Sequence, residues 1–189
     1  MTPARTGRHD RPHIIGVALD LLDRYGLPDL TMRRLATELD VQPSALYWHF
    51  DSKQDLLAAV SDRILARIPD PVTGTELLGA AREVRDALLT YRDGAEVVLS
   101  SSALRPGPSR AEDVLLAALP ATLPDPGPAA TAVLQFILGH TTLVQQRMHG
   151  ESYGAASSSD AVDTGADAGV FEAGIALLSR GAGSTSMQH

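Results

Sequence analysis

Three consecutive residues, Tyr47, Trp48 and His49, place aromatic and hydrogen-bonding side chains on a stretch too short to bury them all. A run of small and polar residues precedes them: Gln42, Pro43, Ser44 and Ala45. Small side chains let a helix approach base edges and thymine methyl groups, while aromatic and imidazole rings pack on sugar and phosphate. The combination predicts a surface that enters the major groove of DNA.

The elements that position these residues follow from the spacing in 31–53, TMRRLATELDVQPSALYWHFDSK. Thr31 can cap a helix whose buried face recurs at three- and four-residue spacing. Asp40 stands at the break and tolerates a left-handed backbone, and Pro43 suits the first position of a second helix. Leu46 and Phe50 then face inward. The stretch predicts a helix-turn-helix.

Three further residues are candidates for DNA contacts. Arg33 has the planar donor fork that matches guanine O6 and N7 or a phosphate. Thr31 and Lys53 lie at the two ends of the motif, where phosphate contacts are expected. The alternative for any single one of these residues is a solvated surface side chain, but the whole set favours DNA binding.

The composition predicts an all-α fold. Hydrophobic residues make up 44% of the 189 residues and aromatic residues only 4%, so Ala and Leu supply most of the core, which favours packed helices. A capping-box pattern, Ser52 with Asp55, opens a connecting helix over 53–67. We expect a helix-turn-helix head over 1–67 and a larger ligand-binding and dimerisation body over 68–189. The other expected helices cover about 12–25, 75–91, 95–99, 109–119, 129–149 and 169–180.

Charge confines any DNA contact to the head. Residues 1–67 carry nine Lys or Arg against nine acidic residues, whereas residues 70–189 carry seven Arg against fourteen acidic residues. An acidic body repels a phosphate backbone. The chain has no cysteine, no apolar run of membrane-spanning length and no signal-peptide pattern, so we expect a cytoplasmic protein without a membrane partner.

The helices expected over 129–149 and 169–180 have apolar faces that a small body does not readily cover. A homodimer through these two helices is the prediction, and ordinary core helices are the alternative. A dimer would also place two recognition helices about 34 Å apart on a near-palindromic site. Residues 150–168, rich in Gly, Ser and Ala, are predicted to form a flexible loop.

The stretch from Leu30 to Lys53, with Leu46 to Phe50 reading Leu-Tyr-Trp-His-Phe before Asp-Ser-Lys, resembles the DNA-binding head of the TetR (tetracycline repressor) family. The Arg-Asp-Gly-Ala of Arg92 to Ala95 fits the same family, and the resemblance covers most of 11–149. It implies a transcriptional regulator, more often a repressor than an activator, which binds a double-stranded DNA operator as a dimer. It also implies a base contact for Arg33 and a small-molecule effector bound in the body.

The resemblance also bears on the effector. Tetracycline-binding members hold a drug–magnesium chelate with two His and one Glu, and the matching positions here are Val98, Pro69 and Met148. None of these side chains suits a hard cation, so we expect an apolar or amphipathic effector other than tetracycline–magnesium, and no metal or cofactor. The expected lining consists of Val84, Leu88, Val98, Ser101, Ser102, Arg105, Gln135, Phe136, Gly139, His140, Leu143 and Met148.

His140 lies on an apolar face beside Thr141 and Thr142, and the alternative to a ligand contact is a core histidine satisfied by the protein itself. Arg105 or Gln135 can orient a polar group of the effector. A metal site made by His140 and His149 is set aside, because the two lie on different faces of one helix.

Two other classes of function are weighed. An enzyme finds no support in the motifs, since the chain has no cysteine, no phosphate-binding glycine loop and no Gly-x-Ser-x-Gly. A helical partner-binding protein without DNA function is the second alternative, and the intact recognition surface argues against it.

Overall fold

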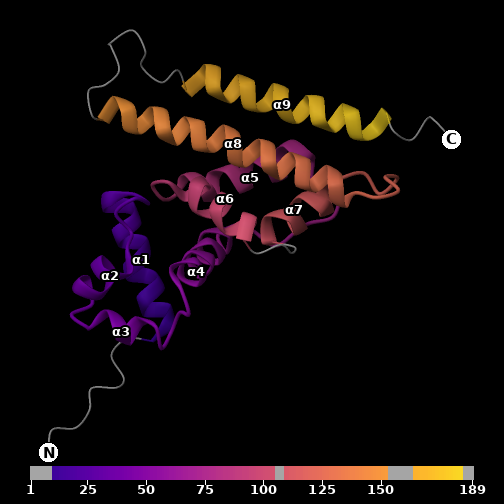
Figure 1. The fold of residues 1–189 in the computed structure, drawn as a ribbon. Coiled ribbons are helices and arrows are strands. Elements are labelled where there is room, and N and C mark those ends of the chain that lie inside the picture. The colour runs from indigo at the N-terminus through magenta and orange to yellow at the C-terminus, as the bar shows by residue number, and fades with distance from the viewer. Residues whose placement is uncertain (1–9, 105–108, 153–163, 185–189) are drawn as a thin grey trace, which may run out of the picture.

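The fold is all-α, as predicted. A computed structural model describes residues 10–104, 109–152 and 164–184, and these three segments contain nine α-helices and no strand. Figure 1 shows a head of short helices, a connecting helix α4, and a body with two long helices on its outer side. The helices are α1 (Arg11–Tyr25), α2 (Met32–Glu38), α3 (Pro43–Leu46), α4 (Lys53–Leu65), α5 (Leu77–Leu89), α6 (Gly94–Leu104), α7 (Arg110–Ala118), α8 (Gly127–Ser152) and α9 (Thr164–Ser184).

The first helix of the head begins and ends as its sequence dictates. The Asp10 carboxylate accepts a hydrogen bond from the His13 backbone N–H at 2.9 Å, and Gly26 ends the helix with a φ of 83°. The apolar spacing over 12–25 predicts that Tyr25 faces inward, but this prediction is wrong, because the Tyr25 side chain is exposed. The Arg34 guanidinium lies 3.8 Å from the centre of the Tyr25 ring. This cation–π contact holds the ring on the surface.

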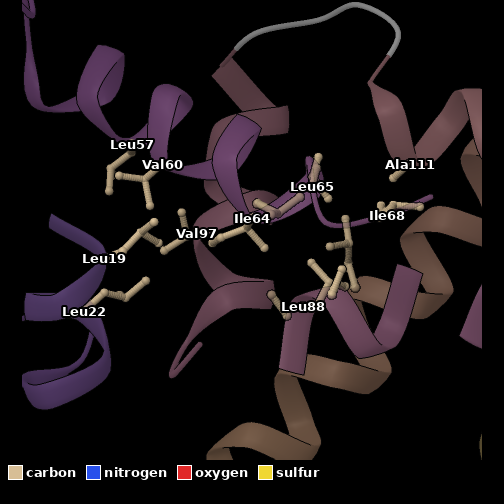
Figure 2. Packing of buried hydrophobic residues seen from close by; sticks show 14 of the residues in the cluster. Leu19, Leu22, Leu57, Val60, Ile64, Leu65, Ile68, Leu88, Val97 and Ala111 are labelled. Carbon is tan, nitrogen blue, oxygen red and sulfur yellow. The ribbon is translucent and has the colours of Figure 1, made fainter. Parts of the chain in front are cut away.

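Helix α4 joins head and body through its buried face. Leu57 and Val60 of α4 face Leu19 and Leu22 of α1 and Val97 of α6 (Figure 2). The buried apolar side chains form one cluster that runs from α1 to α9. A displacement of α4 is therefore transmitted to both parts of the molecule, since close-packed interiors transmit strain.

The two long helices, α8 and α9, run antiparallel as the outer layer of the body (Figure 1). They approach closely at Gly174, where an added Cβ would collide with the Phe136 ring. The prediction of a loop over 150–168 is wrong at both ends, because 150–152 and 164–168 are helical. The Asp167 carboxylate accepts a hydrogen bond from the Arg147 guanidinium at 2.6 Å, a tertiary contact that local sequence patterns do not contain. Residues 153–163 lie outside the described residues.

Helix α6 is also longer than expected. The sequence predicts its end at Leu99, before three serines, but the helix continues to Leu104. The Ser102 hydroxyl donates to the Val98 carbonyl oxygen at 2.9 Å. Serine hydroxyls bond to the helix's own backbone in this way, so the run does not end the helix.

Candidate nucleic-acid interface and ligand cavity

The helix-turn-helix depends on one left-handed residue. Asp40 has a φ of 55°, and its neighbours close the turn with hydrogen bonds from the Val41 N–H to the Ala36 carbonyl at 3.0 Å and from the Leu39 N–H to the Leu35 carbonyl at 3.0 Å. Asp is one of the few residues other than Gly that adopts this conformation readily. The turn therefore forms without glycine.

The second helix of the motif is shorter than its sequence pattern. Regular α-helix covers Pro43–Leu46 only, and a turn continues to Phe50 through hydrogen bonds from the His49 and Phe50 N–H groups to the Leu46 carbonyl at 2.9 and 3.0 Å. Leu46 and Phe50 are buried. These two anchors leave the intervening side chains on the outside of the segment.

The predicted recognition side chains lie on the surface. Trp48 is 90% exposed and Tyr47 is 52% exposed. Gln42, Pro43 and Ser44 are also exposed, while Ala45 and His49 are half-buried. A tryptophan side chain exposed to this degree costs hydrophobic stabilisation. The structure thus brings the predicted recognition residues together on one short segment, 42–50, which we name the recognition segment.

Arg11 fixes this segment to the rest of the head, a role that the sequence analysis missed. Its guanidinium donates to the His49 carbonyl at 2.8 Å and to the Asp55 carboxylate at 3.2 Å, and lies 4.5 Å from the centre of the Phe50 ring. No sequence signal distinguished Arg11 from the other arginines near the N-terminus. Its effect is to hold the end of the recognition segment against α1 and α4.

Two cations of the head are available to an incoming phosphate or base. Arg33 is exposed and Lys53 half-buried, and neither forms an ion pair within the described ranges. By contrast, Arg24 and Arg34 pair with Glu38 and Asp29 at 2.9 and 2.5 Å.

Thr31 has a structural task in addition to the predicted contact. Its side-chain oxygen caps α2 by accepting from the Arg34 N–H at 3.1 Å. The hydroxyl hydrogen is still free to donate to a phosphate, because a hydroxyl both donates and accepts.

Most of the predicted effector lining lies outside the two cavities of about 250 and 970 Å³. Val84, Leu88 and Val98 are fully buried in the core. Gln135, Gly139 and Leu143 are exposed, and Phe136 is half-buried. Ser101 borders a small cavity of about 250 Å³ between head and α6, the Ser102 hydroxyl bonds within its own helix, and Arg105 lies outside the described residues.

A larger cavity of about 970 Å³ lies between the C-terminal half of α5, α8 and the start of α9; we name it the α5–α8–α9 cavity. It includes two of the predicted residues, His140 and Met148. Its apolar wall consists of Leu89, Val144, Met148 and Ala168. Cavities of this size accommodate drug-sized molecules. The apolar spacing of the helix expected over 75–91 predicts a core position for Leu89, but its side chain lines the cavity.

The polar side of this cavity has groups with no partner. The Arg85 Nε, the His140 Nδ1 and the Thr141 Oγ1 are buried and make no hydrogen bond among the described residues. The spacing of the helix expected over 75–91 predicts that Arg85 faces solvent, but its side chain is only 23% exposed. Only the placement of α9 over α5 encloses it, with its guanidinium 4.6 Å from the centre of the Phe171 ring. A local pattern contains no signal for such an enclosure.

One end of the cavity lies where the head contacts the body. Asp23 of α1, Arg92 and His149 border it there. Asp93, which has a φ of 54°, accepts from the Leu27 N–H at 2.8 Å and contacts the His149 Nδ1 at 3.2 Å. One buried carboxylate therefore joins the turn after α1 to the end of α8.

Comparison with known proteins agrees with this architecture. Residues 14–60 match the model of the family described as "Bacterial regulatory proteins, tetR family". The crystal structure of Mycobacterium smegmatis BioQ has 34% identity and a TM-score of 0.78, covering 93% of this chain and 98% of that chain. BioQ has also been solved with its double-stranded DNA operator, at a TM-score of 0.73.

Two further relatives support the same assignment. A possible TetR family transcriptional regulator from Streptomyces coelicolor A3(2) is 31% identical with a TM-score of 0.73, covering 93% of this chain and all of the other. The class A tetracycline repressor from transposon 1721 of Escherichia coli is 43% identical over 106 residues, 52% of this chain and 48% of the repressor. The chain thus matches about half the length of that curated relative.

The fold and the exposed recognition segment define a helix-turn-helix DNA-binding protein with a helical body. The chain belongs to the TetR family of bacterial transcriptional regulators. Members of this family are DNA-binding transcription factors and not enzymes.

Within the described segments, no helix is both long and apolar enough to cross a membrane, and no group of three or more His, Cys, Asp or Glu side chains is arranged to hold a metal ion.

Proposed function

We propose that the chain is a repressor that binds a near-palindromic operator as a homodimer through α8 and α9 and leaves it when a small apolar or amphipathic effector binds the body. The observation that carries the proposal is the exposed recognition segment with Tyr47 and Trp48 beside unpaired Arg33. Such a surface has no structural use in an isolated head, because exposing two large aromatic rings forgoes the free energy of burying them.

The DNA contacts fall into two kinds. Arg33, Gln42, Pro43, Ser44 and Ala45 lie where base edges and thymine methyl groups would be read. Thr31, Tyr47, Trp48, His49 and Lys53 would contact sugar and phosphate and fix the register. The structure of BioQ with its operator supports DNA binding by this chain, because that complex is an example of a similar chain on DNA.

Surface composition supports the dimer. Leu143 of α8 and Val170 and Leu177 of α9 are large apolar side chains with more than half of their surface exposed. The same two helices carry glycines with open space around them: a Cβ added at Gly139 or Gly169 would meet no atom within 4 Å. An apolar outer layer with small residues lets two pairs of helices pack closely as a four-helix bundle. The two heads then act on one operator.

A repressing role with an effector rests on the family likeness, since the class A relative is named as a tetracycline repressor. Magnesium chelation is unsuited to this chain, because Val98 is buried in the core and Pro69 has no side-chain donor. An apolar or amphipathic effector fits the apolar wall of the α5–α8–α9 cavity.

Footprinting the purified protein on the DNA that flanks its own gene tests the proposal. We expect the protein to protect a near-palindromic site, and its affinity for that site to fall steeply as the salt concentration rises. The double variant Tyr47→Ala, Trp48→Ala, checked for unchanged helicity, should lose the footprint. Absence of a protected near-palindrome, or full specific binding by the folded double variant, would contradict the assignment.

A further inference from the structure

We propose that Arg11 and Asp55 form a brace that positions the recognition segment for DNA, although neither side chain contacts the DNA itself. The inference deepens the proposed function and rests on it, because it concerns the segment to which that proposal assigns the DNA contacts. Its consequence is that Asp55, an acidic residue of the head, strengthens the binding of a polyanion.

The recognition segment is too short to hold its own shape. Regular helix covers only Pro43–Leu46, and Gln42 at its start makes no side-chain capping bond. Beyond the helix, the His49 and Phe50 N–H groups share the single Leu46 carbonyl oxygen. Helices of this length are unstable without outside support. The end of the segment must therefore be held by other parts of the head.

Arg11, the first residue of α1, holds that end through three contacts. Its Nη1 donates to the His49 carbonyl oxygen at 2.8 Å, and its Nη2 donates to Asp55 Oδ1 at 3.2 Å. The guanidinium carbon also lies 4.5 Å from the centre of the buried Phe50 ring. A planar guanidinium can direct two nitrogens to two acceptors at once. Arg11 therefore fixes both the backbone and the ring at the end of the segment.

Asp55 holds the chain on the other side of the same point. Its second oxygen, Oδ2, accepts from the backbone N–H of Asp51, the residue that directly follows the recognition segment, at 3.3 Å. Asp55 itself lies in the first turn of α4, where its N–H donates to the Ser52 hydroxyl oxygen at 3.1 Å. A carboxylate is stabilised at this end of a helix. The brace thus joins α1, the end of the segment and α4.

Charge separates a brace from a direct DNA contact. A carboxylate repels phosphate, so on charge alone the loss of Asp55 would tighten DNA binding. A brace predicts the opposite sign, because a segment already held in its binding shape loses less conformational freedom when it binds. The charge of Arg11 is offset by Asp55, so its loss would remove a support and not a phosphate contact.

The head contains a second pair that serves as a matched control. Arg24 donates to the Glu38 carboxylate at 2.9 Å and to the Asp20 carbonyl oxygen at 3.2 Å, and lies 5.7 Å from the centre of the Tyr25 ring. The arginine and acid of this pair are 49% and 39% exposed, against 47% and 33% in the brace. These contacts are of the same kinds, but none of them involves the recognition segment.

The test measures the affinity of the full chain for a duplex that carries the footprinted site, at several salt concentrations. We expect Arg11→Met and Asp55→Ala each to weaken binding by about threefold to tenfold, with an unchanged slope of log affinity against log salt. Loss of a phosphate contact would reduce that slope by about one. Arg24→Met should change the affinity little, and Glu38→Ala should leave it unchanged or tighter.

Amide hydrogen exchange in the free protein tests the brace without DNA. The His49 and Phe50 N–H groups should exchange faster in both brace variants and at the unaltered rate in both control variants. The Val60 N–H, inside α4, reports whether a variant is destabilised as a whole. If Arg11→Met folds poorly, Arg11→Lys replaces it: it keeps the charge but not the planar fork, and should still weaken binding.

Tighter or unchanged DNA binding by Asp55→Ala would overturn the inference, as would a salt slope reduced by about one in Arg11→Met. Full affinity in Arg11→Lys, or unchanged exchange at His49 and Phe50 in the brace variants, would also overturn it. If the unaltered protein binds no site, that result counts against the proposed function, and the exchange rates alone then decide whether the brace exists.

Discussion

Arg33 presents its guanidinium to solvent beside the recognition segment, without an ion pair among the described residues. A bidentate contact to a base contributes about 1–3 kcal/mol of discrimination. We expect Arg33→Ala to weaken operator binding by about tenfold to a hundredfold and to relax specificity at one position in each half-site, measured by competition among operator variants. Arg67→Ala, exposed beyond α4, is the matched control and should change affinity little. Equal losses in both variants would indicate only general charge attraction.

His140 gives a pH dependence of stability with a defined sign. Its folded-state pKa is lowered, chiefly by burial, so the unfolded chain binds its proton more readily. The charged groups that act on it are Arg85 from α5, Arg147 from its own helix and Asp167 from α9. The free energy of unfolding should therefore fall as pH decreases from about 6.5 toward the lowered pKa. Urea unfolding at several pH values should show a shallower fall in His140→Phe than in His13→Phe; parallel curves would contradict this.

At the scale of elements, two left-handed aspartates allow a controlled comparison. Asp40 and Asp93 have φ angles of 55° and 54°, but only Asp93 is buried and bonded to the Leu27 N–H. Alanine at either position incurs the left-handed strain of about 1 kcal/mol. Asp93→Ala also leaves a buried N–H unpaired, at about 1–3 kcal/mol more. We expect Asp93→Ala to be the more destabilising by that margin in chemical unfolding, and equal losses would argue against a structural joint at Asp93.

The same elements show what the sequence predicts and what it does not. The turn at Asp40, the cap at Thr31 and the buried pair Leu46 and Phe50 are local features, and the structure confirms them. The predicted inward orientation of Tyr25 is wrong, because a cation–π contact with Arg34 competes with burial of the ring. The prediction of the effector lining misses Arg85, because this side chain is enclosed only when α9 packs against α5. The spacing of residues along either helix does not contain that arrangement.

At the scale of the whole molecule, the acidic body and the neutral head make the proposed dimer a requirement for tight DNA binding. We expect Leu177→Glu, on the outer face of α9, to shift the protein toward the monomer in sedimentation experiments and to reduce operator affinity, because a single head reads only one half-site. Val72→Glu places the same charge on an exposed apolar residue outside the outer layer and should leave the dimer intact. If sedimentation detects no monomer of Leu177→Glu, the result would contradict the proposed interface through α8 and α9.

The exposure of Trp48 has a spectroscopic consequence. It is the only tryptophan in the chain, and it stands 90% exposed on the recognition segment. Its fluorescence emission therefore originates entirely from the segment that we propose to contact DNA, with the red-shifted maximum of an indole in water. Stacking on a sugar or base would shift and quench that emission, whereas a compound in the α5–α8–α9 cavity would alter it only by moving the head. The protein thus contains its own optical probe of operator engagement, without any added label.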